Sequence, residues 1–144
     1  MSQISPIIFS NSASVPTLRP YQEKLIAEIY TQIRAGIKRI LAFAPTGAGK
    51  TLVIAQIVYH AISRNRRVLI IVHRDSLVSQ TYQKLVNCGV NNCGFIKSGW
   101  KEDRDSLVQI ASVQSLLKRD WWHQYPAEVI VIDEAHIVAY AAVV

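Results

Sequence analysis

Cysteine is scarce in this 144-residue chain, and the marks of secreted and membrane proteins are missing. The two cysteines, Cys88 and Cys93, are too few for a disulfide framework, and no second Cys or His pair with metal-ligand spacing accompanies them. The first residues lack the basic start and apolar core of a signal peptide, and no apolar run approaches membrane-spanning length. We therefore expect a cytoplasmic protein with reduced thiols and no membrane partner.

Charge is also limited, because only 18% of the residues are charged whereas 50% are hydrophobic. This balance favours a folded domain over disorder, and the length suits one domain. Sixteen Lys and Arg against ten Asp and Glu give a net charge of +6. That excess suits a polyanionic partner, but it suits an ordinary basic protein equally well.

Apolar runs separated by helical patterns dominate the rest of the chain. Strands are expected at 40–44, 67–72, 107–111 and 128–132, and helices at 18–36, 49–63, 75–87 and 113–118. The strongest runs are continuous, which is typical of strands buried on both faces, and helices between them indicate parallel pairing with right-handed crossovers. We expect an α/β fold, a three-layer α/β/α sandwich with a mainly parallel sheet, over 18–144. Residues 1–17 read as a loose leader, and 90–104 fit no single element.

A glycine-containing stretch between an expected strand and an expected helix has the pattern of a phosphate loop. It consists of Ala44, Pro45, Thr46, Gly47, Ala48, Gly49, Lys50 and Thr51. Its glycines would let successive N–H groups face an anion at the helix start, Lys50 would reach the β- and γ-phosphates, and Thr51 would ligate Mg²⁺. The alternative is a glycine-rich turn with an exposed lysine.

Two carboxylates follow the last expected strand. Asp133 and Glu134 would lie at the carboxyl edge of the sheet, where the phosphate loop is also expected. Asp133 would hold Mg²⁺ through water, and Glu134 would orient and deprotonate the attacking water. Solvated acids at a strand end are the alternative, and the phosphate loop in the same sheet argues against it.

Five motifs in order carry a resemblance to a known family. They are Leu18-Arg19-Pro20-Tyr21-Gln22, Pro45-Thr46-Gly47-Ala48-Gly49-Lys50-Thr51, His73-Arg74-Asp75-Ser76-Leu77, Ala111-Ser112-Val113-Gln114-Ser115-Leu116 and Asp133-Glu134-Ala135-His136. From Leu18 to His136 the chain resembles the first RecA-like domain of a superfamily 2 DNA/RNA helicase of the DEAH type. The opening motif and the DEAH sequence are more similar to DNA-repair and restriction-type translocases than to DEAD-box RNA helicases.

The resemblance implies a P-loop site for ATP and Mg²⁺ and a partner surface for nucleic acid, with DNA favoured over RNA. Gln22 matches the glutamine that reads the adenine edge, with Arg19 and Tyr21 beside it. His136 matches a residue that couples the ATP site to nucleic acid. The residues matched to nucleic-acid contacts are His73, Arg74, Ser112 and Gln114.

Elementary chemistry supports these nucleic-acid roles in part. A helix start flanked by His73 and Arg74 is a reasonable phosphate site, and a solvated helix start is the less favoured alternative. Ser112 and Gln114 fit capping and surface roles as well. The three tryptophans are expected to pack against the core or helices rather than to stack on bases; they are Trp100, Trp121 and Trp122.

The resemblance also implies a second RecA-like domain whose arginines complete the ATP site, and the chain ends eight residues after His136. We expect a fragment truncated after the DEAH motif that binds nucleotide weakly, hydrolyses it poorly and does not unwind a duplex. An apolar face left open by the missing part would favour self-association. A small phosphate-loop kinase or GTPase is disfavoured, since a GTPase would carry an Asn-Lys-x-Asp signature and none is present. A nucleic-acid or protein binding module with a vestigial ATP site remains the alternative.

Overall fold

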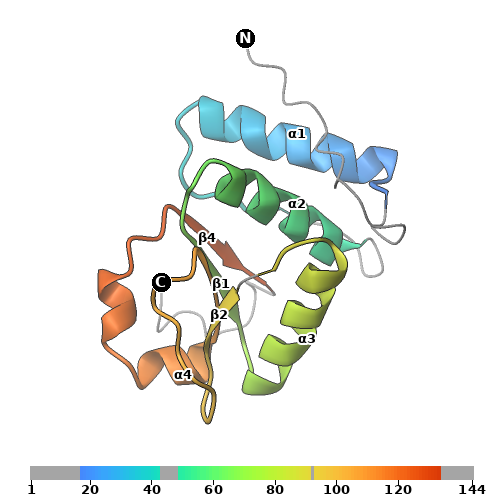
Figure 1. Ribbon diagram of the computed structural model, residues 1–144. Helices are drawn as coiled ribbons and strands as arrows, with labels where there is room; N and C mark the ends of the chain where they lie inside the picture. Colours follow the sequence, from blue (N-terminus) through green and yellow to red (C-terminus); the bar gives the residue numbers. More distant parts are fainter. Residues whose placement is uncertain (1–16, 43–48, 92, 134–144) are drawn as a thin grey trace.

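A computed structural model describes residues 17–42, 49–91 and 93–133 of the chain (Figure 1). Within these residues, four strands form one parallel sheet in the order β2-β3-β1-β4. The elements are α1 (Pro20–Arg34), α2 (Lys50–Ser63), β1 (Val68–Val72), α3 (Asp75–Asn87), β2 (Cys93–Ile96), β3 (Val108–Ser112), α4 (Val113–Leu117), the 3₁₀ helix η1 (Trp121–Gln124) and β4 (Val129–Ile132). None of the helices in the described ranges is long and apolar enough to cross a membrane.

Two apolar clusters, one on each face of the sheet, make the fold a three-layer sandwich. Alternate residues of β1 point to opposite faces: Val68, Ile70 and Val72 join the cluster under α2 and α3, whereas Leu69 and Ile71 join the cluster under α4 and η1. Helix α1 packs on the outside of α2 (Figure 1). The expected α/β/α fold with a mainly parallel sheet is confirmed.

The expected helices at 18–36, 49–63, 75–87 and 113–118 are confirmed as α1 to α4, and three of the four expected strands are confirmed as β1, β3 and β4. The run at 40–44 is wrong as a strand over its described part, 40–42, where the backbone is irregular and Leu41 is 87% exposed. The rest of that run lies outside the described residues. Apolar content alone predicted burial here, but this part of the run does not pair with a neighbouring strand in the described sheet.

Strand β4 departs from the expectation of a buried strand. Its pairing partner among the described strands is β1, so β4 forms an edge of the described sheet, and Ile130 is 57% exposed. A continuous apolar run therefore indicated a strand correctly and its burial incorrectly.

Strand β2 lies within the stretch that the sequence left ambiguous. Gly94 explains both the ambiguity and the strand: a Cβ at this position would lie 2.5 Å from Oε1 of Gln109 and 2.6 Å from the carbonyl oxygen of Asp103. Gln109 is fully buried, and its amide donates to the carbonyl oxygens of Asp103 and Ser106. Glycine weakens strand patterns, yet here its missing side chain lets β2 pack against β3.

Candidate nucleotide and nucleic-acid sites

The start of α2 is built around a glycine in a left-handed conformation. Gly49 precedes the helix with φ 69° and ψ 42°, and no side chain in the described part of the chain caps it. The first two helical residues are Lys50 and Thr51, both partly buried. The predicted helix start after the phosphate loop is therefore present, whereas Ala44, Pro45, Thr46, Gly47 and Ala48 lie outside the described residues.

Gln22 connects this helix start to α1. Its side chain is only 2% exposed; its Oε1 accepts a hydrogen bond from Arg19 N at 2.8 Å, and its Nε2 donates to Gly49 O at 3.2 Å. A Cβ on Gly49 would collide with that Nε2. The geometry at the start of α2 thus depends on a glycine at 49 and a hydrogen-bonding amide at 22.

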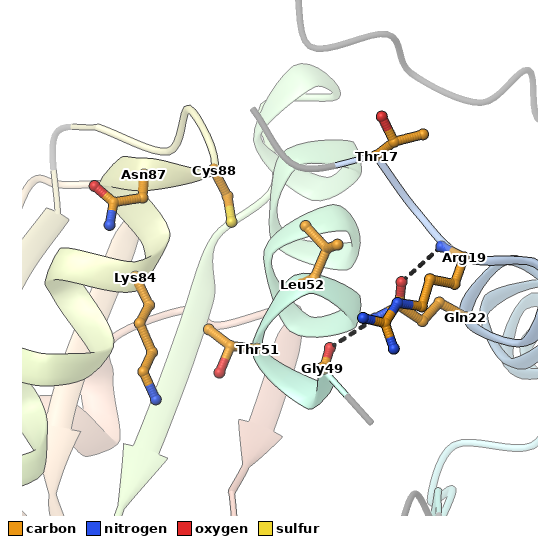
Figure 2. A pocket seen from close by; sticks show the side chains of 9 residues that line it. All are labelled: Thr17, Arg19, Gln22, Gly49, Thr51, Leu52, Lys84, Asn87 and Cys88. Carbon is orange, nitrogen blue, oxygen red and sulfur yellow. Dashed lines mark hydrogen bonds between the residues drawn. The ribbon is translucent and has the colours of Figure 1, made fainter. Parts of the chain in front are cut away.

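A cavity of about 450 Å³ opens beside the contact between Gln22 and Gly49 (Figure 2). It is lined by Thr17, Arg19, Gln22, Gly49, Thr51, Leu52, Lys84, Asn87 and Cys88. Four of the predicted cofactor-binding residues therefore line one hollow, whereas Tyr21 is not among the lining residues and is 41% exposed. Sequence reasoning missed Lys84, Asn87 and Cys88, because no local pattern shows that the end of α3 faces the start of α2.

The parallel register aligns the ends of all four described strands at one edge of the sheet. Val72 pairs with Ser112, Ile71 with Ile132, and Ile96 with Ala111. The residues that follow β1 and β4, His73 and Asp133, are therefore neighbours along this carboxyl edge, and Lys97, which follows β2, lies on the same edge on the far side of β3. Asp133 N donates to Ile71 O at 3.1 Å, which fixes Asp133 against β1.

The predicted nucleic-acid residues have different exposures at this edge. Arg74 and Gln114 are exposed, and His73 is half-buried. Ser112 is fully buried, and its Oγ accepts a hydrogen bond from Ser115 N at 3.1 Å, so it caps α4. The capping alternative therefore describes Ser112 in this structure, and an external ligand does not reach its side chain. Glu134 and His136 lie outside the described residues.

The tryptophans pack as expected. Trp121 and Trp122 lie against the cluster under α4 and η1, and Trp122 Nε1 donates to Leu116 O at 2.8 Å. Trp100 is 38% exposed and meets the ring of Phe95 edge-on, with 4.7 Å between ring centroids. Packing thus accounts for most of their surface.

Both cysteines are free thiols. Burial raises the pKa of Cys88, and it raises the pKa of Cys93 to about 11. Both thiols therefore stay protonated at neutral pH. Within the described ranges, no three His, Cys, Asp or Glu side chains gather in a metal-binding cluster.

The donor set fits a magnesium nucleotide. Hydroxyl and carboxylate oxygens are the ligands that Mg²⁺ prefers, and Thr51 and Asp133 supply them. The start of a 14-residue helix, where no side chain in the described part of the chain caps the N–H groups, suits a polyphosphate, and Lys50 is the first residue of that helix. The cavity next to Gln22 gives the rest of a nucleotide room.

Comparison with known proteins places this geometry in context. Residues 16–143 match the sequence profile of the family described as type III restriction enzyme, res subunit. A putative ATP-dependent helicase of Saccharomyces cerevisiae, IRC3, is 34% identical in an alignment of 142 residues. The alignment covers 90% of this chain and 20% of that protein. The chain therefore spans about a fifth of the length of this curated relative.

Two solved structures share the fold. The UvsW helicase of bacteriophage T4 superposes with a TM-score of 0.67 at 23% identity, covering 83% of this chain and 44% of the other. A nuclease-deletion mutant of the type ISP restriction-modification enzyme LlaGI, in complex with a DNA substrate mimic, also gives 0.67, at 21% identity, covering 89% of this chain and 16% of the other. At these identities the likeness shows the fold.

Proposed function

The chain belongs to the family of the type III restriction enzyme res subunit, a helicase family, and on this premise we propose that it is the ATP-binding domain of a helicase or translocase that couples ATP hydrolysis to nucleic-acid remodelling. The observation that carries the proposal is the contact of Gln22 with Gly49 at the start of α2. There Gln22, Gly49 and Thr51 border one cavity, and Lys50 begins the helix. An adenine-reading amide beside a phosphate loop is the arrangement that the family resemblance implies.

Each residue of the proposed ATP site has a distinct role. Lys50 would neutralise the charge of the β- and γ-phosphates, and Thr51 and Asp133 would hold Mg²⁺. When bound, Mg²⁺ supplies charge neutralisation and orientation of the phosphates. Glu134 orients the attacking water and takes its proton.

Further roles follow from the resemblance to DEAH-type helicases. Gln22 reads the adenine edge, with Arg19 and Tyr21 near it, and the remaining loop residues from Pro45 to Ala48 cradle the phosphates. His136 couples the ATP site to the nucleic acid.

The carboxyl edge of the sheet is the proposed nucleic-acid surface. Exposed Arg74 and Gln114, with His73 between the sheet and Arg74, suit contacts to a phosphate backbone. The net charge of +6 is compatible with such a partner. We favour DNA over RNA because the opening motif and the DEAH sequence resemble DNA translocases, and LlaGI was solved with a DNA substrate mimic.

The complete reaction needs more than residues 18–144. A second RecA-like domain would supply arginines to the γ-phosphate, and such arginines contribute about 10³–10⁵ in rate in related phosphoryl-transfer enzymes. We therefore expect the isolated chain to hydrolyse ATP slowly and to leave a duplex intact. Unwinding of a labelled duplex by this chain alone would contradict that expectation.

The proposed location of the protein is the cytoplasm.

Fluorescence anisotropy with labelled single-stranded DNA and RNA of one sequence tests the nucleic-acid part. We expect binding that weakens as salt rises, because phosphate contacts release counterions, and tighter binding to DNA than to RNA.

Thermal unfolding with ATP and Mg²⁺ tests the nucleotide part, since a ligand that binds the folded state raises Tm. Salt-dependent DNA binding without any ATP-dependent rise in Tm would favour the module with a vestigial ATP site.

A further inference from the structure

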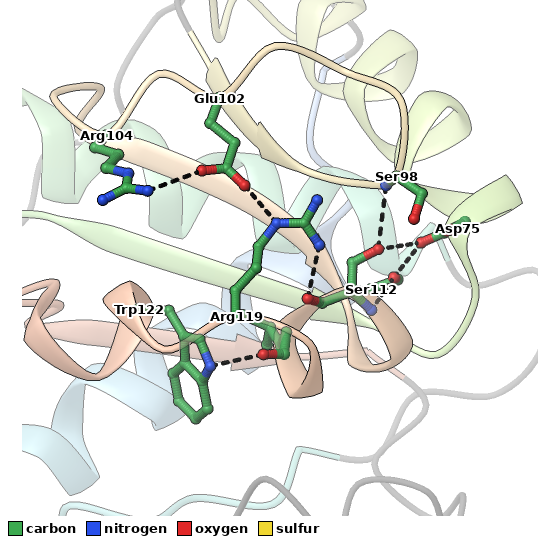
Figure 3. Close-up of polar contacts among 9 residues, drawn as sticks. Asp75, Ser98, Glu102, Arg104, Ser112, Arg119 and Trp122 are labelled. Carbon is green, nitrogen blue, oxygen red and sulfur yellow. Dashed lines mark hydrogen bonds and ion pairs between the residues drawn. The ribbon is translucent and has the colours of Figure 1, made fainter.

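Asp75 is a carboxylate at the carboxyl edge of the sheet that the proposed ATP and nucleic-acid contacts do not use. It is the first residue of α3, directly after His73 and Arg74. Its Oδ1 accepts a short hydrogen bond from Ser112 Oγ and a second one, of 2.8 Å, from Ser115 Oγ (Figure 3). One carboxylate oxygen therefore binds both the end of β3, at Ser112, and α4, at Ser115, through two hydroxyls.

The same hydroxyls also receive backbone N–H groups. Ser115 N donates to Ser112 Oγ at 3.1 Å, and Ser98 N, in the turn after β2, donates to Ser115 Oγ at 3.3 Å. Ser112 and Ser115 are 0% and 1% exposed. Because each hydroxyl hydrogen points to Asp75, the hydroxyl lone pairs are turned toward the amides. The contacts thus run without a break through the segments that follow β1, β2 and β3, which are the start of α3, the turn after β2 and the start of α4.

The groups around Asp75 keep its carboxylate ionised. Burial raises the pKa of Asp75. The hydrogen bonds from Ser112 and Ser115 and the nearby charges of Lys97 and Lys118 together lower it by more than burial raises it, so the pKa lies below its usual range. Lys97 is itself held in place: its Nζ donates to Ser79 Oγ at 3.1 Å, on α3, and lies 4.4 Å from the ring centroid of Trp100. The negative charge of Asp75 is therefore countered by the side chains around it.

A second set of contacts involves α4 and the residues that follow it. Arg119 forms a short ion pair with Glu102 of the loop between β2 and β3, and its Nη1 donates to Ser115 O at 2.9 Å (Figure 3). Glu102 also pairs with Arg104 at 3.4 Å. Ser115 is thus held through its side chain by Asp75 and through its carbonyl by Arg119.

We propose that Asp75 is a positioning residue that joins the segments after β1, β2 and β3 (the start of α3, the turn after β2 and the start of α4) into one rigid rim, from which Arg74 and Gln114 contact the nucleic-acid backbone together. A carboxylate next to a phosphate-binding surface repels the ligand, so contact with the ligand does not explain it. The hydrogen bonds of Asp75 explain its presence, because they set the spacing between Arg74, just before α3, and Gln114, in the first turn of α4. This inference rests on the proposed nucleic-acid binding.

The test compares three variants of the full chain in the anisotropy assay with single-stranded DNA. Asp75→Ala removes the acceptor of both hydroxyls, and we expect its affinity to fall about tenfold. Asp75→Asn keeps Oδ1 as an acceptor and removes the repelling charge, so it should bind at least as tightly as the parent chain. Asp103→Ala is the matched control, because Asp103 also accepts a serine hydroxyl, that of Ser106 at 2.8 Å, but before β3 at the opposite end of the strand; it should bind as the parent does.

Asp75→Asn separates a loss of positioning from a loss of folding, because it keeps the acceptor oxygen. If Asp75→Ala does not fold, Ser115→Ala is tested in its place. It removes the link from Asp75 to Ser98 and should weaken binding severalfold. Asp75→Ala binding as tightly as the parent, or Asp75→Asn binding as weakly as Asp75→Ala, would overturn the proposal. A parent chain that binds no nucleic acid would contradict the proposed function, and this inference with it. Binding by the parent that none of these substitutions changes would contradict this inference alone.

Discussion

Gly49 and Gln22 depend on each other at the start of α2. Gly49 has a positive φ, which costs other residues about 1–2 kcal/mol. In addition, the amide of Gln22 occupies the space that a Cβ at 49 would need. Glycine is therefore required here by the backbone conformation and by a neighbouring side chain.

Gly49→Ala should lower the unfolding free energy by more than the conformational strain alone. Gly36→Ala is the matched control, since Gly36 has φ 89° and an added Cβ would meet nothing within 4 Å. Urea unfolding of both variants measures the difference, which reports the contact with Gln22. Equal losses in the two variants would show that Gln22 moves aside at no cost.

Between elements, a chain of three polar side chains holds α1 against α2. The hydroxyl of Tyr30 lies 2.7 Å from Nδ1 of His60, and Nε2 of His60 lies 3.2 Å from Nε2 of Gln56. Burial lowers the pKa of His60, and the charge of Arg64 lowers it further. The imidazole is therefore neutral in the folded chain at neutral pH.

This contact should make stability depend on pH. Because the pKa of His60 is lower in the folded state, the unfolded chain binds a proton first. The stabilisation is present above the unfolded pKa of about 6.5 and is lost as pH falls through the folded pKa. Urea unfolding at pH 7.5 and 5.5 should show a drop that His60→Gln reduces. His123→Asn, at an exposed histidine, is the control and should keep the full drop.

Much of this element arrangement was predictable from the sequence, because periodicity reports burial directly. Helices α2 and α3 begin and end close to the expected residues, and the ends of β1 and β4 place His73 and Asp133 at one edge, as expected. Strand β2 was missed, because Gly94 weakens its pattern and the reason for the glycine is the distant Gln109. The Asp75 joint was missed because its partners are 37 and 40 residues away, beyond any local pattern.

On the scale of the whole molecule, several large apolar side chains are exposed. Leu41 and Ile130 are 87% and 57% exposed, and β4, which carries Ile130, is an edge of the described sheet. An apolar edge strand is a template for pairing with another chain. We therefore propose that the isolated chain self-associates through this edge.

Sedimentation velocity over a range of concentrations tests this proposal. Ile130→Lys should shift the chain toward monomer, because a charge on an edge strand opposes pairing. Leu117→Lys is the control: it adds the same charge at another exposed apolar side chain, which is 54% exposed and lies on α4. A parent chain that is monomeric at every concentration, or a loss of association in both variants alike, would contradict the role of the β4 edge.

Binding of a nucleoside triphosphate at the start of α2 can be measured in one titration. The parent chain is titrated with a fluorescent ATP analogue and Mg²⁺ beside Lys50→Ala and beside Lys24→Ala, which removes an exposed lysine from α1. We expect the affinity of Lys50→Ala to fall by about tenfold or more while Lys24→Ala binds as the parent does, since an ionic contact to phosphate contributes roughly 1.5–3 kcal/mol. Equal affinities in the parent and Lys50→Ala, or no binding in either, would contradict this expectation.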